Sequence, residues 1–237
     1  MQPELNTDFS QRVVDFPAHA IWHPSPQVGV TRRMLDRQGA EVARATSVVR
    51  YAAGTHFTRH VHGGGEEILV LDGVFSDEFG DYPAGTYLRN PPQTAHAPFS
   101  KQGCTIFVKL WQFQAGDQQS VRLDTTQSAA WQDADGIWTG LATEGLLLHT
   151  HAEVTTALCR LPAGYTTRPQ CYAAGLEILV LAGELRDASG CYPVGTWLRL
   201  PAGSEQAWQT GGQAVQLYVK LGHLGMEGSF VAPCISF

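Results

Sequence analysis

Three histidines and one glutamate have a spacing in this sequence that is typical of a metal site. His60 and His62 stand two positions apart, Glu66 follows four residues later, and His96 comes farther along the chain. Residues two apart on a strand share a face, so one short strand can aim His60 and His62 at the same ion. Three imidazoles and a carboxylate suit a divalent first-row metal. We therefore predict that these four residues bind one metal ion.

The residues around this pattern strengthen the prediction. A lone His-x-His is a weak signal, because histidine is more often an ordinary surface or core residue. Here the run Gly63-Gly64-Gly65 can make a tight path between His62 and Glu66, since glycine tolerates conformations that other residues avoid. We expect His96 to reach the ion from a distant strand.

The sequence contains an internal repeat, which sets the domain organisation. Residues 50–97 align without a gap onto residues 160–207, and the run Glu-Ile-Leu-Val-Leu occurs in both copies. Between the copies, residues 115–129 are rich in Gln, Ser, Thr and Asp, which is typical of a linker. We predict a first domain over 1–114, a linker over 115–129 and a second domain over 130–237.

The repeat also indicates which glutamate is the ligand. Glu66 and Glu67 are adjacent, but Glu67 recurs as Glu177 in the second copy, whereas Glu66 does not recur. The second-copy counterparts of His60, His62, Glu66 and His96 are Gln170, Tyr172, Leu176 and Gln206. A ligand should vanish together with its site, so Glu66 is the predicted ligand and Glu67 has a structural role. The second domain is then expected to lack this metal site and to contribute packing or a partner surface.

The local patterns predict an all-β protein. The sequence has 25 glycines and 13 prolines, so turns are frequent, and no segment carries a sustained helical period with caps. Thr105 to Gln112 alternates in the manner of a strand, and residues 74–77 and 80–82 suggest a hairpin. Short strands separated by regular turns indicate a sandwich or barrel, here present twice.

Composition excludes several classes of function. The formal net charge is −6, and the closest basic cluster, Arg32-Arg33, is too small for a nucleic-acid footprint. No apolar stretch is long enough to cross a membrane, and residues 1–11 do not resemble a secretory signal. The five cysteines are far apart, which suits reduced thiols in the cytoplasm; Cys104 is a weak candidate for a redox thiol. We expect a cytoplasmic protein that binds neither nucleic acid nor membrane.

Several other residues are candidates for lining a pocket beside the metal. Asn90 is the strongest, because it has no counterpart in the second copy, whereas the neighbouring Arg89 recurs as Arg199 and is expected to be structural. The remaining candidates are His56, Tyr87, Phe99 and Phe107.

The first repeat resembles the cupin-like domain of ChrR-type anti-sigma factors. The likeness rests on residues 50–110, including His-Val-His-Gly-Gly-Gly-Glu-Glu at 60–67 and Gly-Asp-Tyr-Pro-Ala-Gly-Thr-Tyr at 80–87, and it recurs in degraded form in the second half. The resemblance implies a bicupin, that is, two tandem cupin barrels of the double-stranded β-helix or jelly-roll type. It also implies zinc binding through His60, His62, Glu66 and His96.

Two functional hypotheses remain open at this point, and whether the protein is an enzyme is not decided. The resemblance implies a zinc-binding sensor or regulatory protein of transcription, with a sigma factor as partner, although these 237 residues contain no His-x3-Cys-x2-Cys motif of the sigma-binding domain. The alternative is an iron-dependent cupin dioxygenase acting on a small diketone or aromatic ketone, because iron can keep coordination positions open for substrate and O₂. Manganese, nickel and a homodimer are further options.

Overall fold

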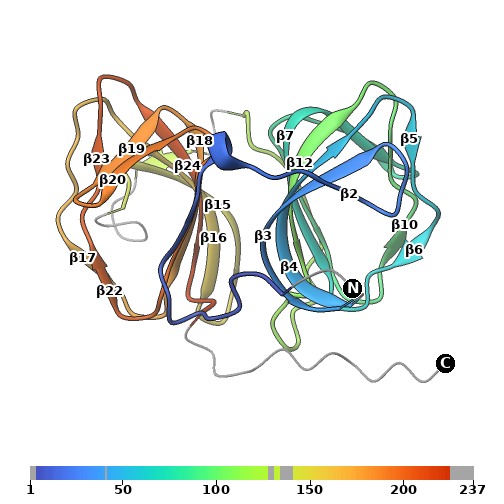
Figure 1. The fold of residues 1–237 in the computed structure, drawn as a ribbon, viewed down its shortest axis with the longest axis horizontal. Coiled ribbons are helices and arrows are strands. Elements are labelled where there is room, and N and C mark those ends of the chain that lie inside the picture. Colours follow the sequence, from blue (N-terminus) through green and yellow to red (C-terminus); the bar gives the residue numbers. More distant parts are fainter. Residues whose placement is uncertain (1–3, 41, 128–130, 134–140, 225–237) are drawn as a thin grey trace. The chain divides into compact units, whose positions relative to one another are not determined.

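The computed structural model describes residues 4–40, 42–127, 131–133 and 141–224, and its chain divides into two compact units. The first unit contains residues 4–7 and 21–126, and the second contains residues 8–20 and 127–224. Strands dominate both units (Figure 1), and the one helix among the described residues is the short 3-10 helix η1, Pro17–His19. The prediction of an all-β protein is confirmed. No helix in the described ranges has the length and hydropathy to cross a membrane.

The first unit is built on a sheet with the strand order β13-β9-β7-β12-β4-β3-β2. Short strands β5, β6, β8, β10 and β11 complete the unit: β8 and β11 pair with the second half of β7, β11 also pairs with β5, and β10 pairs with β6. The strands of this unit are β2 His23–Pro24, β3 Val30–Gly39, β4 Ala43–Tyr51, β5 Thr55–His56, β6 His60–Val61, β7 Glu66–Asp77, β8 Gly80–Pro83, β9 Thr86–Asn90, β10 Ala95–His96, β11 Phe99–Ser100, β12 Cys104–Leu110 and β13 Val121–Asp124.

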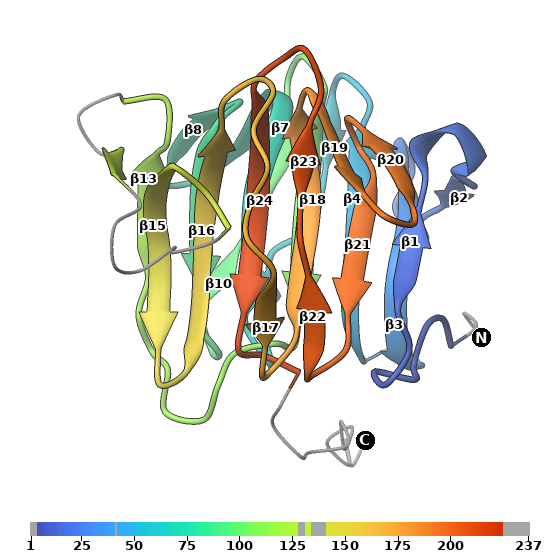
Figure 2. The ribbon, with the colours of Figure 1, turned by 90° about the vertical axis from the view of Figure 1, so that its left-hand side faces the viewer.

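The second unit repeats this topology with the sheet order β1-β21-β18-β24-β16-β15-β14, and Figure 2 shows most of these strands side by side. Smaller sheets β20-β19-β23 and β17-β22 complete it. Its strands are β1 Val13–Asp15, β14 Gln132–Asp133, β15 Glu144–His151, β16 Val154–Leu161, β17 Gln170–Tyr172, β18 Leu176–Ala182, β19 Glu184–Asp187, β20 Gly190–Pro193, β21 Trp197–Leu200, β22 Ser204–Gln206, β23 Gln209–Thr210 and β24 Val215–Leu221.

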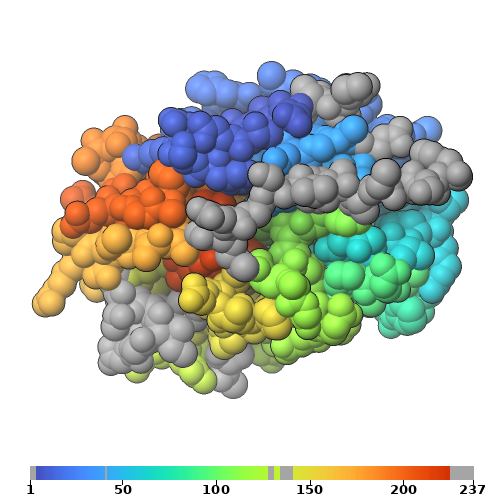
Figure 3. All heavy atoms as spheres, turned by 90° about the horizontal axis from the view of Figure 1, so that it is seen from below, coloured from blue at the N-terminus to red at the C-terminus, as the bar shows by residue number. Residues whose placement is uncertain are grey.

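The units differ from the predicted boundaries in two places. Strand β1, from the N-terminal segment, pairs with β21, so residues 8–20 belong to the second unit. Figure 3 shows dark blue N-terminal atoms beside the orange-red atoms of that unit. Strand β13, from the predicted linker, pairs with β9 of the first unit. In each unit the added strand satisfies backbone groups at a sheet edge that the repeat alone would leave unpaired. The predicted end at 237 lies outside the described residues.

A sharp bend at one glycine lets a single strand serve both sheets of the first unit. Strand β7 pairs with β12 up to Gly73, with a register shift between Val70 and Asp72, and its second half pairs with β8. Gly73 has a φ of 70°, and a Cβ there would lie 2.2 Å from the carbonyl oxygen of Gly103. Only glycine fits such a conformation so close to another backbone. Both ends of β7, Glu66 and Asp77, lie close to His96.

The alternation of β12 decides which side chains reach the interior. Ile106 and Val108 join the apolar core between the sheets, and Phe107 points to the opposite face. The strand predicted over Thr105 to Gln112 is present, but it ends at Leu110 because Trp111 turns to a φ of 57°. Cys104 is also in this core, where burial raises the pKa of its thiol to about 11. A thiol that keeps its proton is a poor nucleophile, which disfavours the redox role considered for Cys104.

Candidate metal centre

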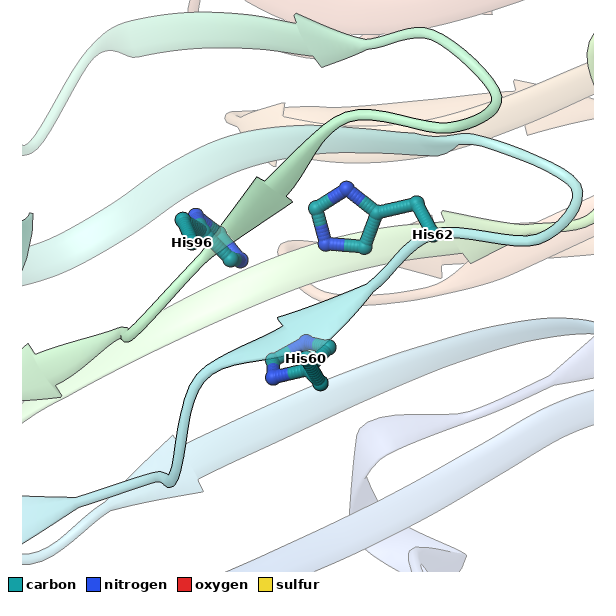
Figure 4. Close-up of side chains that lie close together, drawn as sticks. All are labelled: His60, His62 and His96. Carbon is teal, nitrogen blue, oxygen red and sulfur yellow. The ribbon is translucent and has the colours of Figure 1, made fainter.

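Backbone pairing brings the three predicted histidine ligands together. Strands β6 and β10 are antiparallel, with His60 directly opposite His96, and His62 follows β6 immediately. The three imidazole rings converge (Figure 4). Their ligating nitrogens lie within 4.8 Å of one another. A metal–nitrogen distance of about 2.0–2.1 Å allows two such atoms to be at most about 4.2 Å apart, so only a small contraction would complete the cage.

Glu66, the fourth residue of the predicted set, lies beside the histidines. Its Oε2 lies 3.4 Å from Nε2 of His62 and 3.4 Å from Nε2 of His96. Glu66 opens strand β7 and has the same parity as Ile68, which faces the core between the sheets, whereas Glu67 lies on the opposite face. In the second unit, Glu177 accepts a hydrogen bond from Nε1 of Trp197 at 2.9 Å, which is the kind of structural role expected for Glu67.

Each histidine is held through its Nδ1 atom, which leaves Nε2 facing the centre. Nδ1 of His60 lies 3.1 Å from the carbonyl oxygen of Thr58, and Nδ1 of His96 lies 3.1 Å from Oδ2 of Asp77. Both acceptors lack a proton, so these Nδ1 atoms donate. Nδ1 of His62 is 3.1 Å from Oγ1 of Thr94, whose own hydrogen is donated to the carbonyl oxygen of Pro91. All three rings therefore present an Nε2 lone pair to one point.

The buried nitrogens of two histidines have surroundings that suit metal ligands. Nε2 of His62 and Nε2 of His96 are buried and have no hydrogen-bond partner among the residues that the structure describes. An unsatisfied buried acceptor is costly, and coordination of a cation would satisfy both atoms at once. Burial also lowers the pKa of His62, with the neighbouring imidazoles acting in the same direction and Glu66 opposing them. The neutral form that binds metals is therefore favoured at neutral pH.

A short chain of hydrogen bonds orients the carboxylate of Glu66. Asn90 donates from Nδ2 to Oε2 of Glu66 at 3.2 Å, and its Oδ1 accepts from Nη2 of Arg122 at 2.5 Å. Arg122 is on β13, the strand that the sequence placed in a linker. The sequence analysis therefore named Asn90 and missed Arg122. The position of Arg122 beside Asn90 follows from the pairing of β13 with β9, which the sequence pattern did not predict.

The glycines after His62 leave room for the indole ring of Trp111 to pack beside the site. A Cβ on Gly63 or Gly64 would lie 2.5 Å or 2.2 Å from side-chain atoms of Trp111, which rests on these two residues. Trp111 has a φ of 57°, a conformation that costs energy for any residue other than glycine. In the second copy the corresponding position is Gly222, which has a φ of 83°. The first unit thus places a tryptophan where the backbone favours glycine, and this side chain borders a cavity.

That cavity has a volume of about 250 Å³ and is lined by His60, His62 and Glu66 on one side. The other walls are mainly apolar, and the residues that form them include Val30, Val49, Tyr51, Phe57, Ile106, Val108, Leu110 and Trp111. Cavities for drug-sized ligands measure about 300–1,000 Å³, so this one suits a small metabolite. Burial holds the pKa of Tyr51 well above its usual value, so its hydroxyl keeps its proton.

The other predicted pocket residues lie elsewhere. Tyr87 and Phe107 are fully buried on the opposite face of the sheet, away from the cavity-lining face, because their parity is that of Arg89 and Lys109. His56 stacks on Phe99, with ring centroids 5.6 Å apart, and neither lines the cavity. Asn90 lines a second cavity of about 380 Å³ together with His62, His96 and Arg122. Arg89, predicted to be structural, pairs with Asp117 at 2.8 Å.

In the second unit, large side chains occupy the corresponding space. Gln170 lies opposite Gln206, in the same register as His60 and His96. Tyr172 and Leu176 are buried, and Trp208 donates from Nε1 to the hydroxyl of Tyr172 at 3.1 Å. Among the described residues, the one group suited to a metal is that of His60, His62 and His96.

Two antiparallel sheets with histidines and a glutamate converging inside the unit define the class of cupins. The model of the ChrR cupin-like domain family matches residues 10–114 and again 119–225. The chain belongs to this family, as the resemblance implied, and it carries two copies of the domain. No curated protein sequence matches the chain.

Solved structures support the same fold. A putative dioxygenase from Nostoc punctiforme is 12% identical with a TM-score of 0.72, covering 96% of this chain and 88% of that chain. YlbA from Escherichia coli is 13% identical with a TM-score of 0.68, covering 97% of each chain. The pirin YhhW from Escherichia coli, solved in complex with nickel(II), is 13% identical with a TM-score of 0.65, covering 89% of this chain and 99% of that chain. At such identities the likeness establishes the cupin fold.

We expect the substitution Asp77→Asn to weaken metal binding by about 10- to 100-fold, the usual effect of losing a hydrogen-bond partner of a ligand. An asparagine can still accept at Oδ1 from the hydroxyl of Tyr82, but its amide would point a donor at Nδ1 of His96. The imidazole would then favour the wrong tautomer for coordination. Metal affinity measured by competition with a chromophoric chelator tests this.

The second unit offers a matched control for this substitution. Asp187 accepts hydrogen bonds from the hydroxyl of Tyr192 and the backbone N–H of Ser189, which parallels Asp77 without a histidine. Asp187→Asn should therefore keep full metal affinity. An equal loss of affinity in both variants would contradict the role assigned to the contact between Asp77 and His96.

Proposed function

We propose that the first unit is a metal-dependent enzyme of small-molecule oxidation, most simply a dioxygenase with iron as its metal. The observation that carries this proposal is the cavity of about 250 Å³ onto which His60, His62 and Glu66 open. A purely structural metal site is closed by its protein ligands, whereas a catalytic site keeps one face accessible. When bound, iron(II) would supply the activation of O₂ that no side chain of the cavity can provide.

The residues of the first unit would supply binding, orientation and exclusion of water. The three Nδ1 contacts fix the imidazoles, and Asn90 fixes the carboxylate of Glu66. The apolar walls, with Phe57 and Trp111 among them, favour a small organic molecule over bulk water. The similarity in fold to a putative dioxygenase supports the proposal.

Metal analysis combined with oxygen uptake tests this function. Protein purified without chelators and loaded anaerobically with iron(II) is expected to consume O₂ in the presence of a small 1,3-diketone such as pentane-2,4-dione. Mass spectrometry after reaction under ¹⁸O₂ should find both labelled atoms in the products. Tightly bound four-coordinate zinc, together with no uptake by the iron-loaded protein across a set of diketones and aromatic ketones, would contradict the proposal.

A zinc-binding regulatory role is the second candidate, and membership of the ChrR cupin-like family favours it. In this case His60, His62, Glu66 and His96 would fill a tetrahedral zinc shell. The partner would be a sigma factor, bound without the cysteine motif that is missing from these 237 residues. Pull-down with purified sigma factors, with and without zinc, separates this role from the enzymatic one.

A further inference from the structure

One charged side chain lines the cavity without belonging to the metal centre. Arg32, on β3, is a wall residue of the same cavity as His60 and His62. Strand parity sends Arg32 inward with Val30, whereas Arg33 points to the other face. The remaining walls of the described cavity carry no other arginine or lysine.

Arg32 is buried in part and lacks the partners that its burial calls for. Its Nε and Nη2 atoms are both shielded from solvent, and within the described ranges neither has a hydrogen-bond partner. Burial lowers the pKa of Arg32, but a guanidinium stays protonated at neutral pH. Buried charges in proteins are normally paired, because an unpaired one is costly to desolvate. A group that the folded chain leaves unsatisfied in a cavity points to an external partner.

The internal repeat gives an independent indication. Arg32 lies opposite Val49 in the sheet of the first unit. In the second unit Cys159 corresponds to Val49, and the residue opposite Cys159, which corresponds to Arg32, is Gly145. The arginine is therefore absent from the unit that also lacks the histidines and Glu66. By contrast Arg89, which pairs within the fold, recurs as Arg199. Like the predicted metal ligands, and unlike the structural Arg89, Arg32 has no counterpart in the second unit.

We infer that Arg32 binds the carboxylate of a small, mainly apolar anion whose other end faces the metal centre. This assignment rests on the proposed function, because it names the class of substrate for the same cavity. The planar fork of a guanidinium suits a carboxylate, which accepts two parallel N–H donors. The aromatic walls formed by Phe57 and Trp111 suit the carbon skeleton. The preferred substrate is thus expected to be a small organic acid, and an uncharged ketone of similar shape should bind more weakly.

Calorimetric titration of the metal-loaded full chain with benzoate and with benzamide tests the inference. The two probes share their shape and differ in charge. The wild type should bind benzoate at least about 10-fold more tightly than benzamide. Arg32→Met should weaken the affinity for benzoate by about 10- to 100-fold and leave the affinity for benzamide unchanged. Arg32→Lys should give an intermediate loss, because an ammonium lacks the fork. Arg168→Met, at an exposed arginine of the second unit, is the control and should change nothing.

The possible failures are distinguishable. Equal benzoate affinity in wild type and Arg32→Met, or no benzoate binding by the wild type, overturns the inference and leaves the metal-dependent function standing. Failure of the wild type to take up metal, measured by elemental analysis, contradicts the proposed function, and the same probes then compare the wild type and Arg32→Met in the metal-free chain. Thermal melting supplies a further check, since removal of an unpaired buried charge should leave Arg32→Met at or above the wild-type melting temperature. A clear fall would identify Arg32 as structural and would also overturn the inference.

Discussion

Substitution of His62 by alanine is expected to remove most of the bound metal from the protein. The change deletes one of four converging ligands, and it also frees Thr94 from its contact with Nδ1. Loss of an outer partner alone weakens metal sites by up to about 100-fold, so loss of a ligand should exceed this factor. Elemental analysis after dialysis against a weak chelator gives the metal content per chain.

Gln170→Ala is the matched control, because Gln170 lies in the second unit at the register position of His60. Its metal content should equal that of the wild type. If Gln170→Ala and His62→Ala lost metal to the same extent, the model of a single site in the first unit would have to be abandoned.

Trp208→Ala should destabilise the protein more than any other single substitution considered, by about 3–5 kcal/mol, the usual range for truncation of a buried tryptophan. Trp208 is fully buried, packs in the main core of the second unit and binds the hydroxyl of Tyr172. Truncation would leave a cavity and an unsatisfied hydroxyl together. Chemical denaturation followed by circular dichroism measures the change in the free energy of unfolding.

Val194→Ala provides the comparison within the same unit, since Val194 is half exposed and should change the free energy by less than about 0.5 kcal/mol. Metal content should be unchanged in both variants while they are folded. A small effect of Trp208→Ala would mean that neighbouring side chains collapse into the space, so that the tryptophan does not hold the second unit together.

The sequence predicted the fold and the grouping of the three histidines, because both depend on local patterns. The His-x-His spacing places both histidines on the same face of one strand. The internal repeat allows each position to be compared with a second copy in which the four predicted ligands are replaced. That comparison separated Glu66 from Glu67, and the structure places Glu66 beside the histidines and Glu67 on the other face. The family match and the similar solved structures confirm the cupin fold.

The pocket was harder to predict, because it depends on which face each strand turns inward. Tyr87 and Phe107 are aromatic and close to the motif in sequence, but their parity sends them to the far face. The sequence showed Arg32 only as part of a basic pair with Arg33. The lack of hydrogen-bond partners at its Nε and Nη2 atoms is visible only in the folded structure. Arg122 was hidden for a similar reason, because a four-residue strand in a polar segment has no distinctive pattern.

The pairing of β1 with the distant strand β21 has a consequence for biosynthesis. Strand β1 is translated before the other described strands, yet its neighbour Arg12 donates to the hydroxyl of Tyr192, 180 positions later. At about 5–20 residues per second, the N-terminal segment must wait roughly 10 to 40 seconds for its sheet, while the whole first unit is being translated. The first unit can therefore fold on the ribosome before the second unit is complete, and a nascent chain that stalls between them would contain a folded first unit and an unpaired β1 segment.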